Sequence, residues 1–269
     1  MKIHLSTPKD HLKRLVRDLL LQALESEPGE VWLVTPWLKD VEFDLQGAGV
    51  QRSVLGTTAP SIGLLSLLER LAHRHDVTLI VKPPHELVDL NVLRDLHDSL
   101  LLRERLRDPD DFEDAHLQST LFAERQQLID QQRRAFLNHA DTVLNGERVA
   151  AAGVRVAYCA NLHAKLLWLP NGGLFGSANF TNGGLSFNAE LMAEVLSDED
   201  IGALRAAAHG LLAGSLDRQA YLLTDPSAVP HRSRMPLETF SHLAHSPLVQ
   251  AVPGITPILE VFGDLYTPR

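Results

Sequence analysis

Two pairs of polar side chains in the second half of the chain have types and spacing that suit phosphate chemistry. His163 and Lys165 are separated by one residue, and so are Ser177 and Asn179. Between the pairs, two short apolar segments flank Asn171-Gly172, which is a strong hairpin signal. Residues two apart share a face of a strand, so each pair projects to one side. If the hairpin aligns its two ends, an imidazole, an ammonium, a hydroxyl and an amide converge on one patch that could bind and attack a phosphate group.

These residues resemble the HxK…GSxN signature of the phospholipase D superfamily. His163, Lys165, Gly176-Ser177 and Asn179 occur in the family's order and at nearly its spacing. Further along, Asn188-Ala189-Glu190 places Glu190 where single-motif nucleases of the superfamily carry the carboxylate that orients the histidine. The resemblance implies the superfamily's fold, a phosphodiesterase activity and a catalytic set formed by these side chains.

The sequence departs from the family pattern in two ways. The family usually has an aspartate five residues after the lysine, and Pro170 stands there, in a hairpin one residue shorter. Two-motif members carry two HxK copies, whereas no other histidine of this chain is followed two residues later by lysine. The resemblance extends over residues 28–200 or so, and a single motif implies half of an active site per chain.

Single-motif members of the family complete the site by pairing, and the chemistry explains why. Displacement at a phosphodiester needs an attacking group on one side of phosphorus and a proton donor to the leaving oxygen on the other. A two-fold symmetric homodimer brings the same patch from both subunits face to face. His163 of one subunit would then attack and form a phosphohistidine, while His163 of the other would protonate the leaving alcohol and later activate water.

The remaining motif residues have supporting roles in this scheme. Lys165 and Asn179 from both subunits would hold the non-bridging oxygens, with Ser177 as a helper. Glu190 would accept a hydrogen bond from the far ring nitrogen of His163 and fix its tautomer. The scheme requires no metal and no other cofactor.

The resemblance favours a metal-independent nuclease, and two alternatives stay open. Short single-motif members resemble nucleases, so we expect nucleic acid as the substrate, DNA in preference to RNA, with a role in DNA processing or in defence against foreign DNA and with partner proteins of such a system. The first alternative is a phospholipase or phosphatidyl-transfer enzyme with the same site. The second, motivated by Pro170, is a non-catalytic subunit that binds nucleic acid or a partner protein.

The elements around the motif predict an α/β fold with a mixed, largely parallel β-sheet flanked by helices. Apolar residues recur at helical spacing over 8–24 and 62–73, and continuous apolar runs typical of strands buried on both faces cover 31–35, 77–81 and 154–159. Strand, helix and strand in succession form a parallel crossover unit. We expect one domain over residues 1–214.

Two segments do not fit the crossover pattern. Residues 88–150 read as two helices joined by a turn at the acidic stretch 108–114, either a solvated insertion covering the sheet or an arm for dimerisation or substrate guidance. Residues 215–269 are rich in proline and predict an irregular tail with short helices packed on the domain. No internal repeat is visible.

Composition excludes several classes of protein. The 269 residues carry 34 acidic and 25 Lys or Arg side chains, a formal charge of −9, which argues against a wholesale cationic nucleic-acid wrapper. Cys159 is the only cysteine, so no disulfide can form within the chain. No run approaches the ~18 apolar residues of a membrane span, and the first ten residues lack a signal peptide's apolar core. We expect a cytoplasmic protein with no membrane association.

Other polar or reactive side chains are weaker candidates. The histidine pairs His73/His75 and His242/His245 have metal-compatible spacing but no completing Cys or acidic cluster, so we assign no metal site. Cys159 reads as a small buried hydrophobe and Trp168 as core packing on the opposite strand face. Several basic residues lie among acids and leucines and predict solvated faces, with a substrate groove as the alternative: Arg103, Arg105, Arg107, Arg133, Arg134, and His231-Arg232-Ser233-Arg234.

Overall fold

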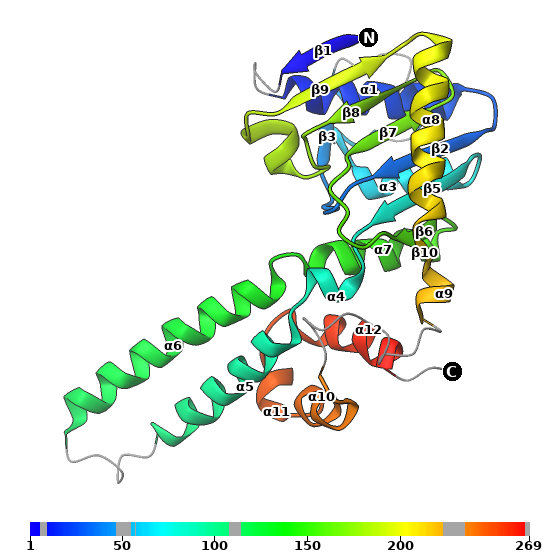
Figure 1. Cartoon of the computed structure of the whole chain (residues 1–269). Helices are drawn as coiled ribbons and strands as arrows, with labels where there is room; N and C mark the ends of the chain where they lie inside the picture. The colour runs from blue at the N-terminus through cyan, green and yellow to red at the C-terminus, as the bar shows by residue number, and fades with distance from the viewer. Residues whose placement is uncertain (6–9, 47–54, 57, 108–113, 223–234, 267–269) are drawn as a thin grey trace. The chain divides into compact units, whose positions relative to one another are not determined.

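A β-sheet forms the centre of the first of two units into which the chain folds (Figure 1). The structure, a computed structural model, describes residues 1–5, 10–46, 55–56, 58–107, 114–222 and 235–266. Unit 1 comprises Met1–Pro83 and Asn145–Tyr221, and unit 2 comprises Pro84–Leu144 and Leu222–Arg269. All five predicted site residues therefore belong to unit 1.

The central sheet has eight strands in the order β1-β9-β8-β7-β2-β5-β6-β10. The strands are β1 (Lys2–Leu5), β2 (Glu30–Val34), β5 (Asp76–Val81), β6 (Arg155–Tyr158), β7 (Leu166–Leu169), β8 (Gly172–Gly176), β9 (Leu191–Val195) and β10 (Leu216–Asp217). β2, β5 and β6 are parallel neighbours, and the other neighbouring pairs are antiparallel. Strands β1, β8, β2, β5 and β6 consequently point one way, and β9, β7 and β10 the other. The predicted α/β class with a mixed sheet is confirmed, and parallel neighbours are confined to β2, β5 and β6.

The parallel part arises from the predicted crossover. After β2, the chain forms the small hairpin β3 (Glu42–Asp44) and β4 (Ser61–Gly63), then α3 (Leu64–Ala72), and returns as β5. The continuous apolar sequences of these strands fit burial on both faces, and Val31, Leu33 and Leu79 have no exposed surface. The connection from β5 to β6 passes through unit 2 and α7 (Ala140–Ala151).

Helices cover both faces of the sheet. Figure 1 shows α1 (His11–Glu25) and α3 on one face and α8 (Asp198–Ala213) across the other. On the α8 face, Trp168 packs with Ile201 and Leu204, and its indole N–H donates to the Ile201 carbonyl at 2.9 Å. The prediction that Trp168 is a core residue is confirmed.

The predicted hairpin joins β7 to β8. Leu169 pairs with Gly172, so the two loop residues are Pro170 and Asn171, one position earlier than the Asn171-Gly172 signal suggested. Gly172 belongs to the strand because the next strand lies close to it: a Cβ at Gly172 would be 3.3 Å from the Val195 carbonyl oxygen. The hairpin thus brings the two ends of the HxK…GSxN segment to one edge of the sheet.

Unit 2 contains the predicted helical insertion. α5 (Leu90–Arg105) and α6 (Ala115–Leu137) pack against each other, after the short α4 (Pro84–Leu87). The acidic stretch between them ends at Asp114, whose carboxylate caps α6 by accepting from the His116 N–H at 2.8 Å. Ile129 and Phe136 are the buried residues of α6, and its other residues are partly or fully exposed.

The C-terminal helices join the insertion. α10 (Leu237–Ala244) and α11 (Pro247–Gln250) pack against α5, α12 (Thr256–Tyr266) contacts α10, and Arg133 Nε donates to the Pro253 carbonyl at 2.9 Å. The sequence pattern predicted residues 215–269 as a tail packed on a domain of residues 1–214; the structure shows that α10 and α11 of this segment pack against α5. The basic stretch 231–234 lies outside the described residues. Among the described helices, none is long and apolar enough to cross a bilayer.

Candidate active site

The predicted site residues lie at the edge of the sheet where the parallel strands β2, β5 and β6 end. Leu166, the first residue of β7, pairs with Val34, the last residue of β2, so the chain before β7 reaches this edge. β8 leaves the sheet at the same edge through Ser177, and β9 enters there after Glu190. The carboxyl ends of parallel strands are where ligands bind in α/β sheets.

His163 and Lys165 precede the strand β7, whereas the sequence pattern placed both residues on a strand. β7 begins at Leu166, although the ladder extends one step further through the Gly176 N–H, which donates to the Lys165 carbonyl at 3.2 Å. The His163 side chain is exposed, and Lys165 Nζ donates to the His163 carbonyl at 2.7 Å. This contact folds the lysine back over the short segment and keeps its ammonium beside the imidazole-bearing residue.

Ser177 and Glu190 are in direct contact. Ser177 Oγ donates to one carboxylate oxygen of Glu190 and accepts from the Leu191 N–H at 3.0 Å. Asn188 Nδ2 donates to the other oxygen of Glu190 at 3.5 Å. The expected hydrogen bond from the His163 ring to Glu190 stays a prediction, and Ser177 and Asn188 are two donors to the Glu190 carboxylate.

The glycine of the motif is required by a close approach of two strands. A Cβ at Gly176 would lie 2.1 Å from the Leu191 carbonyl oxygen and 2.9 Å from Met192 Cα, both backbone atoms that a side-chain rotation cannot move. A glycine at this position lets β8 and β9 approach closely enough for the Ser177 N–H to donate to the Leu191 carbonyl at 2.9 Å. Gly176 therefore positions Ser177 against Glu190.

Asn179 is held on the other side of the motif by the end of β2. The neighbouring Phe180 N–H donates to Thr35 Oγ1 at 3.3 Å, and Thr35 itself is fully buried. A Cβ at Gly184, in the π-helix η2 (Gly183–Phe187), would be 2.3 Å from the Asn179 carbonyl oxygen, so this turn packs tightly on Asn179. Among the described residues, Asn179 Oδ1 is one of the few buried side-chain oxygens with no hydrogen-bond partner. This oxygen can only accept a hydrogen bond, so the N–H groups of the Asn179 amide are the atoms that could donate to a phosphate oxygen.

The electrostatics of the edge centre on Lys165. Partial burial lowers the pKa of the Lys165 ammonium, the Glu190 carboxylate raises it, and the nearby Lys82 ammonium lowers it. Lys82 immediately follows β5 and is a second cation of this edge that the sequence reasoning missed. Its position directly after the apolar strand sequence 77–81 could have identified it, because residues that follow parallel strands gather at one edge of the sheet.

The other sequence candidates do not join this set. The ring of His75 is buried, and its Nδ1 accepts from the Gly29 N–H at 3.2 Å, at the opposite end of β5. His242 packs edge-on against His97 within unit 2. Among the residues that the structure describes, no group of three or more His, Cys, Asp or Glu side chains is arranged to hold a metal ion. Cys159 is partly buried against the α8-side core.

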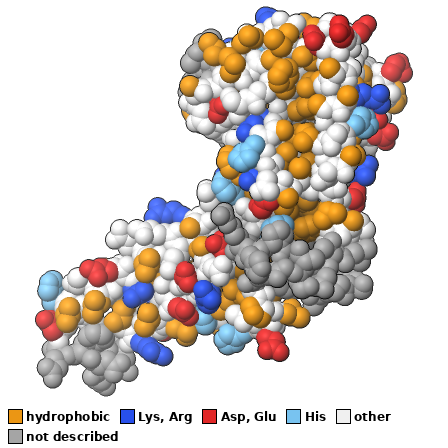
Figure 2. All heavy atoms as spheres, viewed as in Figure 1, with side chains coloured by type: hydrophobic (Ala, Val, Ile, Leu, Met, Phe, Trp, Pro, Cys, Tyr) orange, Lys and Arg blue, Asp and Glu red, His pale blue; other side chains and the backbone are white. Residues whose placement is uncertain are grey.

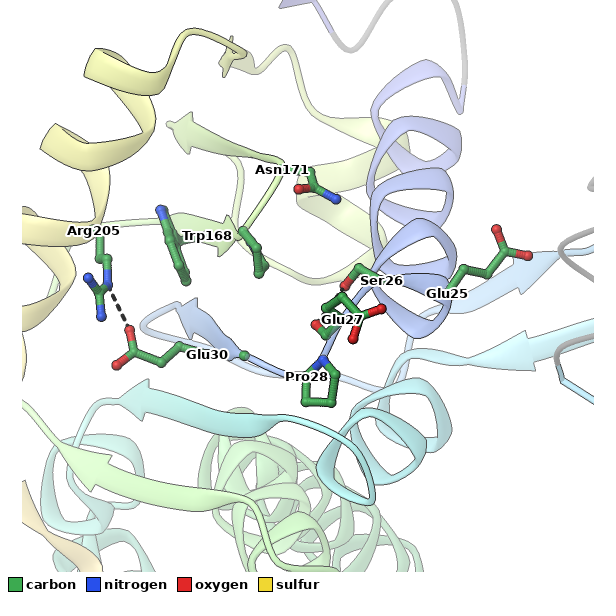
Figure 3. Close-up of a pocket in the computed structure, with 10 residues that line it drawn as sticks. Glu25, Ser26, Glu27, Pro28, Glu30, Trp168, Asn171 and Arg205 are labelled. Atoms are coloured by element: carbon green, nitrogen blue, oxygen red, sulfur yellow. Dashed lines mark hydrogen bonds and ion pairs between the residues drawn. The ribbon is translucent and has the colours of Figure 1, made fainter.

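A cavity of about 550 Å³ lies at the opposite edge of the sheet, where β2 begins and the β7–β8 hairpin turns (Figure 3). Its lining includes Glu27, Glu30, Trp168 and Arg205, and the Arg205 guanidinium donates to Glu30 at 2.8 Å. None of the predicted site residues lines this cavity.

Comparisons with known proteins found similarity in structure alone. No family model and no curated protein matches the sequence. The fold is similar to Nuc, a phospholipase D family member from Salmonella typhimurium, at 11% identity and a TM-score of 0.42, over 80% of this chain and 97% of that one. It is also similar to NucT from Helicobacter pylori, at 11% identity and a TM-score of 0.39, over 80% and 98% of the two chains. Phosphatidylserine synthase from Haemophilus influenzae Rd KW20 matches at 9% identity and a TM-score of 0.37, over 80% of this chain and 38% of that one.

Proposed function

We propose that this protein is a phosphodiesterase, most directly a nuclease that cleaves DNA or RNA without a metal through a phosphohistidine intermediate. The observation that carries the proposal is the convergence of three separate segments on one sheet edge. The segment before β7 supplies His163 and Lys165, the segment after β8 supplies Ser177 and Asn179, and the segment before β9 supplies Glu190. Together they provide a nucleophile, a cation and neutral hydrogen-bonding groups, which phosphoryl transfer requires.

The proposed reaction has two steps. A ring nitrogen of His163 attacks phosphorus, the bond from phosphorus to the leaving oxygen breaks, and His163 of a second subunit gives its proton to that oxygen. Water then attacks the phosphohistidine, loses a proton to the second histidine and releases a phosphate monoester and the first histidine. Lys165 and Asn179 stabilise the charge on the non-bridging oxygens. Glu190 lies close enough to Lys165 to raise its pKa and so favours the charged ammonium.

An exposed apolar surface next to the site supports the proposal that a second subunit binds there. Ile3 pairs with Ala193 and Ala193 with Phe175, while Leu5 pairs with Leu191, so these side chains share one face of the sheet. Ile3, Leu5 and Leu191 are each about half exposed or more, at 61%, 55% and 48%. We call this set, with Phe175, the β1–β9–β8 patch, and Figure 2 shows hydrophobic side chains gathered over these strands. Contiguous exposed apolar surface of this kind marks association sites, and Leu191 directly follows Glu190.

The activity is tested with labelled single-stranded DNA, duplex DNA and RNA in excess EDTA. We expect wild-type protein to cleave at least one of these polymers and His163→Ala to cleave none. Equal activity of the two proteins, or no cleavage of any phosphodiester by either, would refute the proposal. Turnover of phosphatidylcholine vesicles without nucleic-acid cleavage would instead assign the lipid alternative, and binding without turnover the non-catalytic one.

The shared site has a separate test. Leu191→Lys on the patch should convert a dimer into a monomer by light scattering at micromolar concentration and remove the activity. Leu216→Lys is the matched control, because Leu216 is similarly exposed, at 46%, on β10 at the other end of the sheet. A monomeric wild-type protein that retains full activity would contradict the shared site.

A further inference from the structure

The loop after β2 presents an aromatic ring and a cation directly beside the proposed site. Leu38 is fully buried and forms a parallel bridge to Phe180, the residue that follows Asn179. Its neighbours Trp37 and Lys39 are both partly exposed. In an extended segment alternate residues point to opposite sides, so Trp37 and Lys39 project together away from the core.

Backbone contacts fix this loop to the motif segment. Thr35 Oγ1 donates to the Trp37 carbonyl at 2.8 Å and accepts from the Phe180 N–H at 3.3 Å. The Lys39 N–H donates to the Phe180 carbonyl at 3.3 Å, and Asn145 Nδ2 donates to the Leu38 carbonyl at 3.0 Å. The positions of Trp37 and Lys39 relative to Asn179 are therefore set by the fold.

Trp37 also differs from the other tryptophans of the chain. Trp32 and Trp168 belong to the core, with 3% and 6% of their surfaces exposed, so their indoles are accounted for by packing. Trp37 lies at the carboxyl edge of the sheet, where Lys39, Lys82 and Lys165 supply positive charge in a chain whose formal charge is −9. An aromatic face next to cations that can bind the backbone is the combination that binds single-stranded nucleic acid.

We propose that Trp37 and Lys39 form a nucleotide subsite, in which a base beside the scissile phosphate stacks on Trp37 and a backbone phosphate binds Lys39. The bases of a duplex have their faces covered by their neighbours, so this subsite selects single-stranded or locally unpaired nucleic acid. The inference rests on the proposed phosphodiesterase site and adds the substrate class to it.

Binding is measured on a His163→Asn background, so that cleavage does not interfere, with a fluorescein-labelled twelve-residue oligothymidylate and the same strand in a duplex. Base stacking contributes about 1–3 kcal/mol, so Trp37→Leu should weaken single-strand binding by about fivefold or more. Trp37→Phe should restore most of the affinity, and duplex binding should change little. Equal affinities of Trp37→Leu and its parent, or a stronger effect on the duplex, would overturn the subsite.

Lys39 gives a second readout that holds even if the tryptophan variants fold poorly. Lys39→Gln should reduce the slope of log affinity against log salt by about 0.7, the value for one phosphate contact on a single strand. Arg74→Gln is the matched control, because Arg74 is exposed in the turn before β5 at the opposite edge of the sheet and should leave the slope unchanged. Unchanged slopes for both variants would contradict the role of Lys39.

The failure of the subsite can be told from the failure of the proposed function. Hydrolysis of bis(4-nitrophenyl) phosphate by wild-type protein tests the phosphodiesterase chemistry without needing a base. Hydrolysis of this ester combined with oligonucleotide binding that ignores Trp37 would refute the subsite alone. Trp37-dependent binding with no hydrolysis of any phosphodiester would refute the activity and leave a single-strand-binding surface.

Discussion

Replacing Gly176 by alanine should separate β8 from β9 and thereby damage the site. The new Cβ would meet the Leu191 carbonyl oxygen at 2.1 Å, whereas ordinary contacts begin at 3.4 Å, so the strands must move apart by about 1.3 Å at this point. Such a movement breaks the hydrogen bond from the Ser177 N–H to the Leu191 carbonyl, now 2.9 Å, and the one from the Leu191 N–H to Ser177 Oγ, now 3.0 Å. Overpacking costs about 1–3 kcal/mol and each of the two lost hydrogen bonds about 0.5–1.5 kcal/mol, so we expect Gly176→Ala to lower the free energy of unfolding of unit 1 by about 2–6 kcal/mol.

The chain provides a specific signal and a matched control for this experiment. All three tryptophans, Trp32, Trp37 and Trp168, belong to unit 1, so intrinsic fluorescence in urea reports the unfolding of that unit. Gly202→Ala is the control, because Gly202 lies inside α8 with no atom within 4 Å of its ideal Cβ position. That substitution should stabilise unit 1 by about 0.5–1 kcal/mol, since alanine is the better helix former.

The two alanine variants should thus shift the urea midpoint in opposite directions. Gly176→Ala should also lose phosphodiesterase activity under conditions where unit 1 is still folded, because Ser177 no longer reaches Glu190. An unfolding midpoint for Gly176→Ala at or above that of the wild type would show that the strands are not as close as described. Full activity in a destabilised variant would show that the Ser177–Glu190 contact does not serve the reaction.

Three further predictions follow from the charges of unit 1 and from the shared site. Glu190→Gln removes the carboxylate that raises the pKa of Lys165, so the alkaline loss of activity should begin at a lower pH than in the wild type. Lys82→Gln removes a cation that lowers this pKa, so the alkaline loss should begin at a higher pH. A pH–rate profile in which both variants shift in the same direction would contradict the role of Lys165 as the charged group. Burial lowers the pKa of His11 below its usual 6.5, so the unfolded chain binds the proton more readily than the folded one. The stability of unit 1 should therefore decrease as the pH falls below 6.5. Urea midpoints measured between about pH 5 and 8 should depend less on pH in His11→Asn than in the wild type. Equimolar mixing of wild-type protein with His163→Asn should leave about half of the activity per wild-type subunit after random exchange of subunits, because a dimer with His163 in only one subunit is inactive. Activity unaffected by mixing would place both catalytic steps in one chain.

Much of unit 1 could be predicted because its sequence patterns are local. Continuous apolar runs over 31–35, 77–81 and 154–159 correspond to β2, β5 and β6, and the helical spacing over 8–24 corresponds to α1. The hairpin was predicted from the short apolar segments around residue 171. Each of these signals lies within about one element, so tertiary packing had little scope to override it.

The features that were not predicted depend on contacts between distant segments. β7 begins at Leu166 because its partner strand β2 ends at Val34. The hairpin sequence alone could not predict this starting point, since it does not specify how β7 pairs with β2. Lys82 belongs to the edge through the order of the parallel strands, which a spacing pattern does not specify. α10 and α11 pack against α5, and a pattern within either segment cannot specify an association between segments that lie far apart in the sequence.

The contact between Ser177 and Glu190 narrows the role of the serine in the proposed site. A hydroxyl carries one proton, and Ser177 Oγ donates it to Glu190 while accepting from the Leu191 N–H. Ser177 therefore has no proton left to donate to a phosphate oxygen, and we assign it to positioning the carboxylate. Lys165, whose pKa responds to Glu190, and Asn179, through the N–H donors of its amide, are then the groups available to contact a phosphate oxygen beside His163. The motif serine acts on the reaction through Glu190, and the substrate contacts come from the two segments that the hairpin brings together.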